Sequence, residues 1–336
     1  MKKAVILFNL GGPDKLESIE PFLFNLFNDP AIISIPSIFR YPLAKFISKR
    51  RTPIAKNIYK EIGNKSPILE LTQNQAKKLE NILEKKGDYK CFVVMRCWHP
   101  RAVDVIKKVK EYNPDEMILL PLYPQYSAST SGSSINEWND LCNKENYRVK
   151  TKTICCYPTE NNFIESHVRL IKESIKNLEN KNFKLLFSAH GLPENKIKKG
   201  DPYQWQIEQT VDGIMSKLLD ENLDYVISYQ SRVGPLKWIG PSTDEVIIKY
   251  SKEKKGIVIV PVAFVSEHSE TLVELDIEYK KLAEKNGCDF YKRVPALGIE
   301  ENFIKGLTEL VLQNETKGNF VSSLMCPSKF IKCPCK

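Results

Sequence analysis

The sequence predicts an α/β fold made of two similar halves, each a parallel sheet flanked by helices. Short apolar runs alternate with longer segments in which apolar residues recur every three or four positions, as in amphipathic helices. The runs are apolar almost throughout, which is typical of parallel strands that are covered on both faces. They also fall into two comparable sets along the 336 residues. Strands that alternate with helices in this way build doubly wound sheets.

The predicted elements follow one another in a regular order. We expect strands at 4–10, 90–96, 117–123, 151–156, 184–188, 224–228 and 256–264. We expect helices at 73–86, 102–112, 162–178, 204–219 and 270–285. A polar stretch at 143–146 separates the two sets, so the predicted domains are 1–150 and 151–321. A Cys-rich tail, 322–336, follows them and lacks a helical pattern.

Composition narrows the class of protein. The net charge of +9 comes from 50 basic and 41 acidic residues. Lysines are scattered along the chain, some in adjacent pairs, which indicates solvated faces and would also favour an anionic ligand or membrane. The chain enters its first strand directly after Met1-Lys2-Lys3, and no apolar run reaches the roughly 18 residues of a membrane span. Nine cysteines without an export signal indicate reduced thiols. We therefore expect a cytoplasmic protein, either free or peripheral at the inner face of the membrane.

The stretch 31–47 is unusual, because it is apolar yet interrupted by Pro36 and Pro42. Its pattern is too irregular for one helix. It fits a packed core loop, or an exposed apolar lip for an apolar ligand or a membrane surface. The sequence supports the two interpretations equally.

The strand-end motif FSAHGLP places one imidazole at the edge of a sheet. His190 closes the strand, and the acidic segment 266–278 follows the next apolar strand of the same half. Because ligands of open α/β sheets bind at the carboxyl edge, we expect the two segments to contribute to one site. Imidazole and carboxylate groups suit a divalent metal or proton transfer. Taken alone, His190 would more often be a hydrogen-bonded core or capping histidine, and the acidic segment is what favours a site.

The acidic segment carries a row of carboxylates. Glu270, Glu274 and Glu278 are spaced by four and would share one face of a helix, with Glu267 one turn earlier. Apolar neighbours would limit their solvation, raise some of their pKa values and let them hold protons. A solvent-exposed acidic face is the alternative.

Other strand ends carry groups that suit a large, flat, anionic ligand. Arg96 could bind a carboxylate in a bidentate pair, or hold loop carbonyls as a structural arginine. Tyr123 and Trp238 offer aromatic surface, or belong to the core. The turn at Gly11-Gly12 permits a close backbone approach but lacks a phosphate-binding fingerprint. Three further donors would, taken alone, be surface residues: Arg51, Tyr59 and Ser66.

Taken together, these motifs resemble the ferrochelatase family, whose members insert ferrous iron into protoporphyrin IX to make haem. The matching segments, in chain order, are LFNLGGP, RRTP, WHP, PLYPQYS, FSAHGLP, YQSRVGPLKWIGPSTDE and PVAFVSEHSETLVELDIEY. The resemblance implies two Rossmann-like, chelatase-like domains with the active-site cleft between them. It also implies a lyase that releases two protons as it forms protohaem, the last step of haem biosynthesis.

The resemblance gives each candidate residue a role. It makes His190 and Glu270 the inner site, where His190 either ligates the metal or accepts a pyrrole proton. It implies a proton or metal path through Glu267, His268, Glu274 and Glu278. It implies substrate contacts from Arg51, Tyr59, Ser66, Arg96, Tyr123 and Trp238. The stretch 31–47 corresponds to an apolar lip at the pocket.

No cofactor is required on this hypothesis, since Fe(II) is a substrate. We expect protoporphyrin IX and Fe(II) as partners, peripheral membrane contact through 31–47, and no nucleic acid. Some ferrochelatases hold a [2Fe–2S] cluster through three cysteines near the end and a fourth elsewhere. This tail offers Cys326, Cys333 and Cys335 in a spacing unlike the animal one, and Ala128 stands where animal enzymes have the fourth ligand. The sequence leaves open whether the tail binds a cluster, and it favours a loose tail with reduced cysteines.

Two other classes of function remain as alternatives. A porphyrin or haem carrier on the same scaffold could lose His190 or Glu270, and both are present. A chelatase for another metal or tetrapyrrole would lack the WHP and YQSRVGP segments. Both observations favour ferrochelatase.

Overall fold

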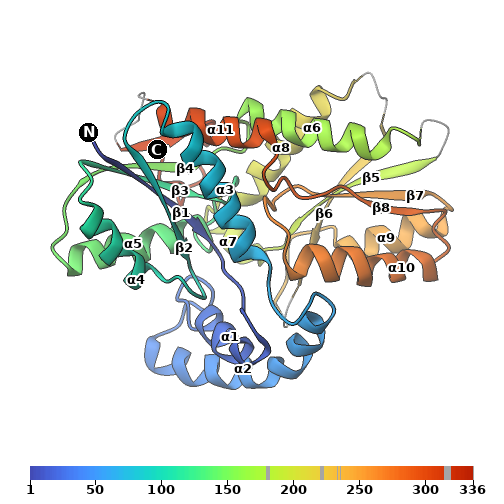
Figure 1. Ribbon diagram of the computed structural model, residues 1–336. Helices are drawn as coiled ribbons and strands as arrows, with labels where there is room; N and C mark the ends of the chain where they lie inside the picture. Colours follow the sequence, from blue (N-terminus) through green and yellow to red (C-terminus); the bar gives the residue numbers. More distant parts are fainter. Residues whose placement is uncertain (179–181, 220–222, 233, 235, 314–318, 336) are drawn as a thin grey trace. The chain divides into compact units, whose positions relative to one another are not determined.

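The computed structural model describes residues 1–178, 182–219, 223–232, 234, 236–313 and 319–335 (Figure 1). The chain divides into two compact units. The first contains Met1–Cys156 and Leu307–Ser322, and the second contains Tyr157–Gly306 and Ser323–Pro334. Each unit is built on a parallel sheet, as the apolar runs predicted.

The first unit contains a five-stranded parallel sheet in the order β2-β1-β3-β4-β9. Its strands are β1 (Lys3–Asn9), β2 (Tyr89–Met95), β3 (Glu116–Pro121), β4 (Lys150–Cys156) and β9 (Phe320–Ser322). Its helices are η1 (Leu16–Ser18, a 3-10 turn), α1 (Ile19–Phe27), α2 (Ser37–Lys60), α3 (Ile68–Leu83), α4 (Ala102–Tyr112) and α5 (Ser131–Lys144). Helix α11 (Glu301–Leu312) begins in the second unit and ends in the first.

The core of the first unit explains why its strands are apolar throughout. Ile6 and Phe8 of β1 pack against Val105 of α4 and Trp138 of α5, and all four side chains are buried. Leu7, which points to the opposite face of the sheet, is buried as well. A strand covered on both faces has no solvated position for a polar side chain.

The predicted boundary at residue 150 differs from the observed division. β4 pairs with β3 along 116–119, and β9 then adds beside β4, so the first sheet includes residues from both ends of the chain. The segments 151–156 and 307–322 therefore belong to the first unit. Pairing between strands that are so far apart in sequence leaves no local signal.

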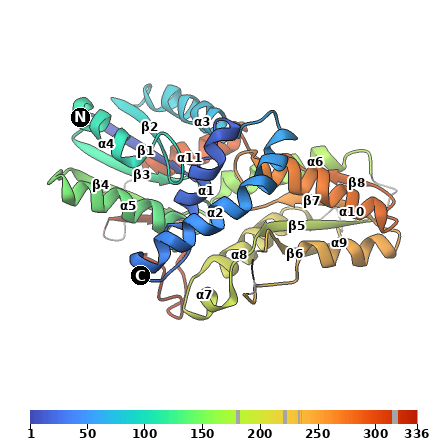
Figure 2. The ribbon, with the colours of Figure 1, turned by 90° about the horizontal axis from the view of Figure 1, so that it is seen from below.

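Helix α2 corrects the expectation for 31–47. From Ser37 onward this stretch is helical although Pro42, and later Pro53, lie inside the helix. Proline removes a backbone donor, so a carbonyl one turn earlier loses its partner. For Pro42 that residue is Ile38, which is 75% exposed, so water can satisfy the carbonyl. Helix α1 lies alongside α2 (Figure 2).

The second unit contains a four-stranded parallel sheet in the order β6-β5-β7-β8. Its strands are β5 (Phe183–His190), β6 (Tyr225–Gln230), β7 (Gly256–Pro261) and β8 (Tyr291–Arg293). Its helices are α6 (Asn161–Ile175), α7 (Glu194–Lys198), α8 (Tyr203–Ser216), α9 (Thr243–Lys252), the π-helix η3 (Glu270–Tyr279) and α10 (Lys280–Lys285).

The two units share one strand order. In each, the second, first, third and fourth strands in sequence lie side by side, so the chain changes direction between the first strand and the third. Ligands of open α/β sheets bind at such a switch point, beyond the carboxyl ends of the strands. In the second unit this point lies between β5 and β7.

One face of the second sheet packs against the elements that follow β6 and β7. Leu186 and Ile259 of the sheet contact Val246 of α9 and Leu275 of η3 in one buried cluster. Figure 1 shows α9 and α10 on one side of this sheet and α6 on the other. The predicted helix 270–285 is therefore present, but its first ten residues are π-helical.

His167 is an isolated polar group in the core of the second unit. It lies on α6, is 1% exposed, and its ring packs edge-on against Phe163 with centroids 4.9 Å apart. Neither ring nitrogen has a hydrogen-bond partner among the described residues. Burial lowers the pKa of His167 to about 3, so the imidazole is neutral in the folded protein at neutral pH.

We expect the free energy of unfolding to fall as the pH drops from about 6.5 towards about 3. The unfolded chain binds the His167 proton near pH 6.5 and the folded chain does not, so acid favours unfolding by about 2 kcal/mol between pH 7 and pH 5. His167→Leu should remove this component of the slope in denaturant titrations at the two pH values. His99→Ala is the control, because the His99 side chain is 66% exposed. An unchanged slope in His167→Leu would contradict the assignment.

The Cys-rich tail is packed, in contrast to the loose tail that was favoured. The Phe330 ring stacks on Trp205 with centroids 5.3 Å apart, and the Lys332 amide donates to the Gly200 carbonyl at 3.0 Å. Gly200 has a φ of +87°, and a β-carbon there would lie 2.7 Å from the Ile331 side chain. The tail residues 323–334 therefore form part of the second unit.

Candidate functional site: an imidazole–carboxylate cluster at the edge of the second sheet

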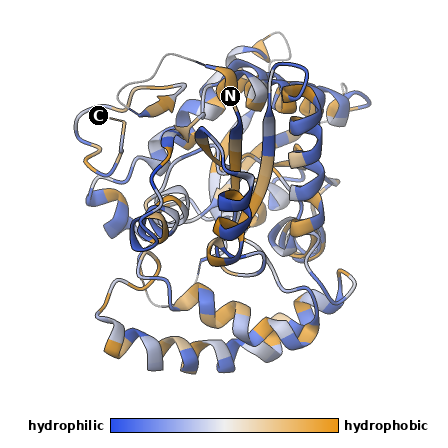
Figure 3. Cartoon of the chain, turned by 60° about the vertical axis from the view of Figure 1, so that its left-hand side comes forward, coloured by the Kyte–Doolittle hydropathy of each residue, from blue (hydrophilic) through white to orange (hydrophobic). Residues whose placement is uncertain are grey.

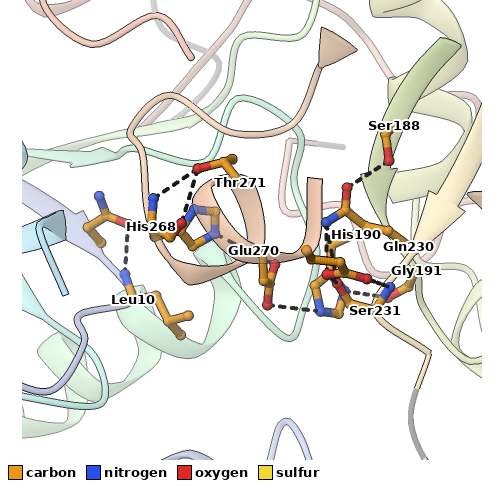
Figure 4. A network of polar contacts seen from close by, with 11 residues as sticks. Leu10, Ser188, His190, Gly191, Gln230, Ser231, His268, Glu270 and Thr271 are labelled. Atoms are coloured by element: carbon orange, nitrogen blue, oxygen red, sulfur yellow. Dashed lines mark hydrogen bonds and ion pairs between the residues drawn. The ribbon is translucent and has the colours of Figure 1, made fainter. Parts of the chain in front are cut away.

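The candidate site lies at the switch point of the second unit. His190 is the last residue of β5, and the chain leaving β7 leads to His268 and the start of η3. Figure 4 shows Glu270 at the start of η3 turned toward His190. The two motifs that the sequence placed at one sheet edge are therefore brought together.

The local structure fixes the orientation of His190. Its Nδ1 lies 2.6 Å from the Gly191 carbonyl oxygen, which can only accept, so Nδ1 carries a proton. In the neutral imidazole, Nε2 is then the atom with a free lone pair. The Trp238 ring lies beside the imidazole with centroids 6.4 Å apart. A β-carbon on Gly191 would lie 3.1 Å from that ring, so glycine permits this packing.

Glu270 lies between two imidazoles. One carboxylate oxygen is 3.7 Å from His190 Nε2 and the other is 3.6 Å from His268 Nε2. Burial alone would raise the pKa of Glu270, but the charges of His190 and His268 lower it to about 2. Glu270 is therefore ionised across the physiological pH range and can stabilise a positive charge on either side.

Glu274 lies four residues after Glu270 on η3, and its carboxylate is held by hydrogen bonds and not by imidazoles. Its carboxylate accepts hydrogen bonds from the Ser231 amide at 3.0 Å, the Ser231 hydroxyl at 2.5 Å, Gln230 Nε2 at 3.1 Å and the Tyr279 hydroxyl at 2.9 Å. Burial and the charge of Glu270 nevertheless raise the pKa of Glu274. Glu274 is thus better able than Glu270 to hold a proton.

The backbone around Glu274 is specialised. Ser231 has a φ of +61°, the left-handed region that is costly for a residue other than glycine. This conformation turns both the amide and the hydroxyl of Ser231 to Glu274. Tyr279 lies five residues after Glu274, one turn of a π-helix, which sets its hydroxyl over the carboxylate.

The two other acidic residues of the predicted path, Glu267 and Glu278, differ in burial and in ion pairing. Burial would raise the pKa of Glu267, but Arg293 and hydrogen bonds, including one from the Ala296 amide at 3.0 Å, lower it. Glu267 Oε1 also lies 2.9 Å from Arg293 Nη1, so this carboxylate is held ionised. Glu278 is exposed at the far end of the row.

Five of the predicted substrate residues lie in the first unit. Arg96 is engaged there: its guanidinium contacts Asp29 at 3.0 Å, Glu137 at 2.9 Å and Ser133 at 2.7 Å. These contacts favour the structural alternative for Arg96. They border a cavity of about 570 Å³ that is also lined by Ala128.

Three of the other four predicted substrate residues differ in how deeply they are buried, and Ser66 is described below. Tyr59 is buried in a cluster with Ile19 and Phe22. The Arg51 guanidinium lies over the Phe27 ring, 5.9 Å from its centroid. Burial raises the pKa of Tyr123.

Ser66 explains the glycine pair at the end of β1. Its amide donates to the Pro13 carbonyl at 2.8 Å. A β-carbon on Gly12 would lie 2.5 Å from the Ser66 side chain, so Gly12 allows the two segments to pack closely.

No group of three or more His, Cys, Asp or Glu side chains is arranged to hold a metal ion in the part of the chain that the structure describes. The tail cysteines divide between the units, with Cys335 in the first and Cys326 and Cys333 in the second. Cys326 Sγ accepts a hydrogen bond from Gln206 at 3.2 Å. These thiols do not form a cluster site within either described unit.

Sequence reasoning missed four residues that shape the site. Gln230, Ser231 and Tyr279 surround Glu274, and Arg293 holds Glu267. Gln230 and Ser231 follow a predicted strand, which was a signal that could have found them. The partnership of Glu274 with Tyr279 depends on the π-helical turn, and nothing in the spacing indicated that.

Comparisons with known proteins identify the family of the chain. A family model for ferrochelatase matches residues 2–315. The ferrochelatase of Pelagibacter ubique is 66% identical over 342 residues, covering 100% of this chain and 99% of that protein. The ferrochelatase of Rickettsia felis is 51% identical over 346 residues, with coverage of 100% and 99%. Among solved structures, SirB from Bacillus subtilis with Fe3+ has a TM-score of 0.52 at 14% identity, covering 93% of this chain and 94% of that chain.

The SirB likeness concerns the fold alone: two parallel sheets flanked by helices. The family model and the full-length relatives define a metal chelatase, an enzyme of the lyase class. The chain belongs to the ferrochelatase family.

Proposed function

We propose that this protein inserts Fe(II) into protoporphyrin IX, with loss of two protons, to form protohaem at the last step of haem biosynthesis. The observation that carries the proposal is Glu270 held between His190 and His268 at 3.7 and 3.6 Å, with Glu274 beside it. Such a cluster supplies a base, a fixed negative charge and a second proton acceptor. Metallation of a porphyrin requires all three, because two pyrrole protons leave as the cation enters.

The proposed order of events follows from the protonation states. In its neutral form His190 accepts a pyrrole proton at Nε2, and ionised Glu270 stabilises the imidazolium that results. Glu274, whose pKa is raised, takes up a proton next, and exposed Glu278 passes it to solvent. Glu267 does not carry a proton in this scheme, because Arg293 keeps it ionised. Its ion pair with Arg293 instead holds the segment just before η3 in place.

The porphyrin contacts are proposed from the same residues that the family resemblance implied. Trp238, beside His190, would provide an aromatic wall for the flat macrocycle. The Arg51 guanidinium lies against the Phe27 ring and contacts no carboxylate of the described residues. Arg51 is therefore a better partner for a propionate than Arg96, which already contacts two carboxylates.

The proposed function is tested by incubating the purified protein anaerobically with Fe(II) and protoporphyrin IX and recording the visible spectrum. The haem spectrum should replace the porphyrin spectrum at a rate proportional to enzyme. Coproporphyrin in a parallel reaction measures substrate preference. Porphyrin fluorescence quenched without metallation would instead indicate a carrier.

We also propose that the protein contacts membranes through the first half of α2, on the apolar lip 31–47. The exposed side chains there are large and apolar: Ile38, Phe39, Tyr41 and Phe46 are 75%, 65%, 56% and 62% exposed. Exposed lysines and Arg50 follow along the same helix. Apolar side chains beside cations suit the interface of an anionic membrane. Apolar segments of this region are visible at the bottom of Figure 3.

Phe39→Glu with Phe46→Glu should weaken binding to vesicles of mixed zwitterionic and anionic lipid by about tenfold or more, because each change removes a ring that would enter the lipid and adds a charge that anionic lipid repels. Co-sedimentation measures the bound fraction. Val103→Glu, a comparable change at a 49% exposed position on α4, is the control and should bind normally. Equal binding by the double variant would refute the membrane contact.

No helix in the described ranges is long and apolar enough to cross a membrane. We propose a cytoplasmic enzyme that associates peripherally. A reduced tail without a [2Fe–2S] cluster is the favoured alternative, and iron and sulfide analysis of the purified protein tests it.

A further inference from the structure

Strand β8 holds a polar contact to η3 that the proposed chemistry does not use. The Arg293 side chain, 12% exposed, ends this edge strand. Its Nε and Nη2 donate to the two carboxylate oxygens of Asp276 at 2.6 and 2.9 Å, and its Nη1 donates to Glu267 at 2.9 Å. A bidentate pair of this kind fixes the direction as well as the distance between its partners.

A second side chain of β8 reaches the next residue of the helix. The Tyr291 hydroxyl donates to the Leu275 carbonyl oxygen at 2.6 Å. Leu275 and Asp276 are adjacent, so one short strand holds two consecutive residues of η3. Asp276 follows Glu274 by two residues, about half a helical turn, so its carboxylate lies on another face of the helix.

The contacts from β8 matter for the position of Glu270 and Glu274, because η3 has an unusual helical conformation. π-Helical stretches are rare and usually limited to one turn, whereas η3 extends over ten residues. Gln230, Ser231 and Tyr279 hold the face that carries Glu274. Arg293 and Tyr291 hold the helix from β8, and Arg293 also neutralises two partly buried carboxylates that would otherwise repel each other.

We propose that Arg293 is a positioning residue for metal insertion, which holds η3 through Asp276 and Glu267 so that Glu270 and Glu274 face His190. The inference rests on the proposed function of that site. Arg293 touches no reacting atom and acts only through the helix.

Arg293→Met keeps an unbranched apolar stem of similar bulk to the aliphatic part of arginine and removes its charge and its donors. We expect kcat to fall by about 10–100-fold, as for a misplaced catalytic group, with the KM for protoporphyrin changed by less than about threefold. Hydrogen exchange of the amides in 270–279 should become faster. Arg293→Lys should recover part of kcat, because it restores the charge without the fork.

Three further variants separate positioning from general stability. Arg169→Met breaks an ion pair of α6 with buried Glu300, 2.7 Å long and in the same unit, and should leave kcat and exchange in 270–279 unchanged. Asp276→Asn should reproduce the kcat loss of Arg293→Met. The double variant Arg293→Met/Asp276→Asn should lose little more than Arg293→Met alone, because the bidentate contact between Arg293 and Asp276 is already broken in that single variant.

Wild-type kcat in Arg293→Met, unchanged exchange in 270–279, or fully additive losses in the double variant would each overturn the inference and leave the proposed function intact. Wild-type protein that forms no haem would instead overturn the proposed function, and the positioning role with it.

Discussion

His190→Ala is expected to lower the rate of metal insertion by about 10²–10⁴-fold, the range for loss of a general base, while porphyrin binding persists. The reason is the fixed tautomer: with Nδ1 held by the Gly191 carbonyl, Nε2 is the proton acceptor beside Glu270. Stopped-flow absorbance under anaerobic conditions measures insertion, and quenching of porphyrin fluorescence measures binding.

His99→Ala is the matched control. The His99 side chain is 66% exposed and lies 3.5 Å from Asp104, in the first unit. It should insert metal at the wild-type rate. If His190→Ala retained wild-type turnover, His190 would not be the base. If it lost porphyrin binding as well, its role would be in binding.

Glu270→Gln is expected to reduce kcat by about 10²–10³-fold, the size of effect seen when one preorganised electrostatic contact is removed. The amide keeps the shape of the side chain but loses the charge that lies between His190 and His268. Because the pKa of Glu270 is about 2, the carboxylate is ionised at every usable assay pH. The loss should therefore be the same at about pH 6 and about pH 8.

Glu284→Gln makes the same chemical change at an exposed position on α10 and should leave turnover unchanged. A loss in Glu270→Gln that disappeared at one end of the pH range would mean that Glu270 titrates there and is not a fixed charge. Unchanged turnover would remove Glu270 from the site.

The fold was largely predictable because burial on two faces leaves a strong local signal. The run 90–96 became β2, and the helix expected at 102–112 is α4. The prolines of α2 misled the prediction, since the rule that proline ends a helix assumes that the freed carbonyl has no other partner. The exposed surface at Ile38 removes that assumption.

The site was predictable in part. His190 and Glu270 stand at strand and helix ends, where a sequence motif and a sheet edge coincide, and the structure places them 3.7 Å apart. The different protonation of Glu267, Glu270 and Glu274 could not be inferred from their spacing. Each pKa depends on neighbours that come from other elements, such as Arg293 from β8 and Ser231 after β6.

The sequence by itself determined the α/β class, the strand-end motifs and the membership of one family, because apolar periodicity and contiguous motifs are local properties. Only the tertiary structure decided that β9 completes the first sheet, that residues 270–279 wind as a π-helix, and that one carboxylate in the acidic row can hold a proton while its neighbours stay ionised. These features arise from contacts between residues far apart in the chain, and a local pattern carries no record of them.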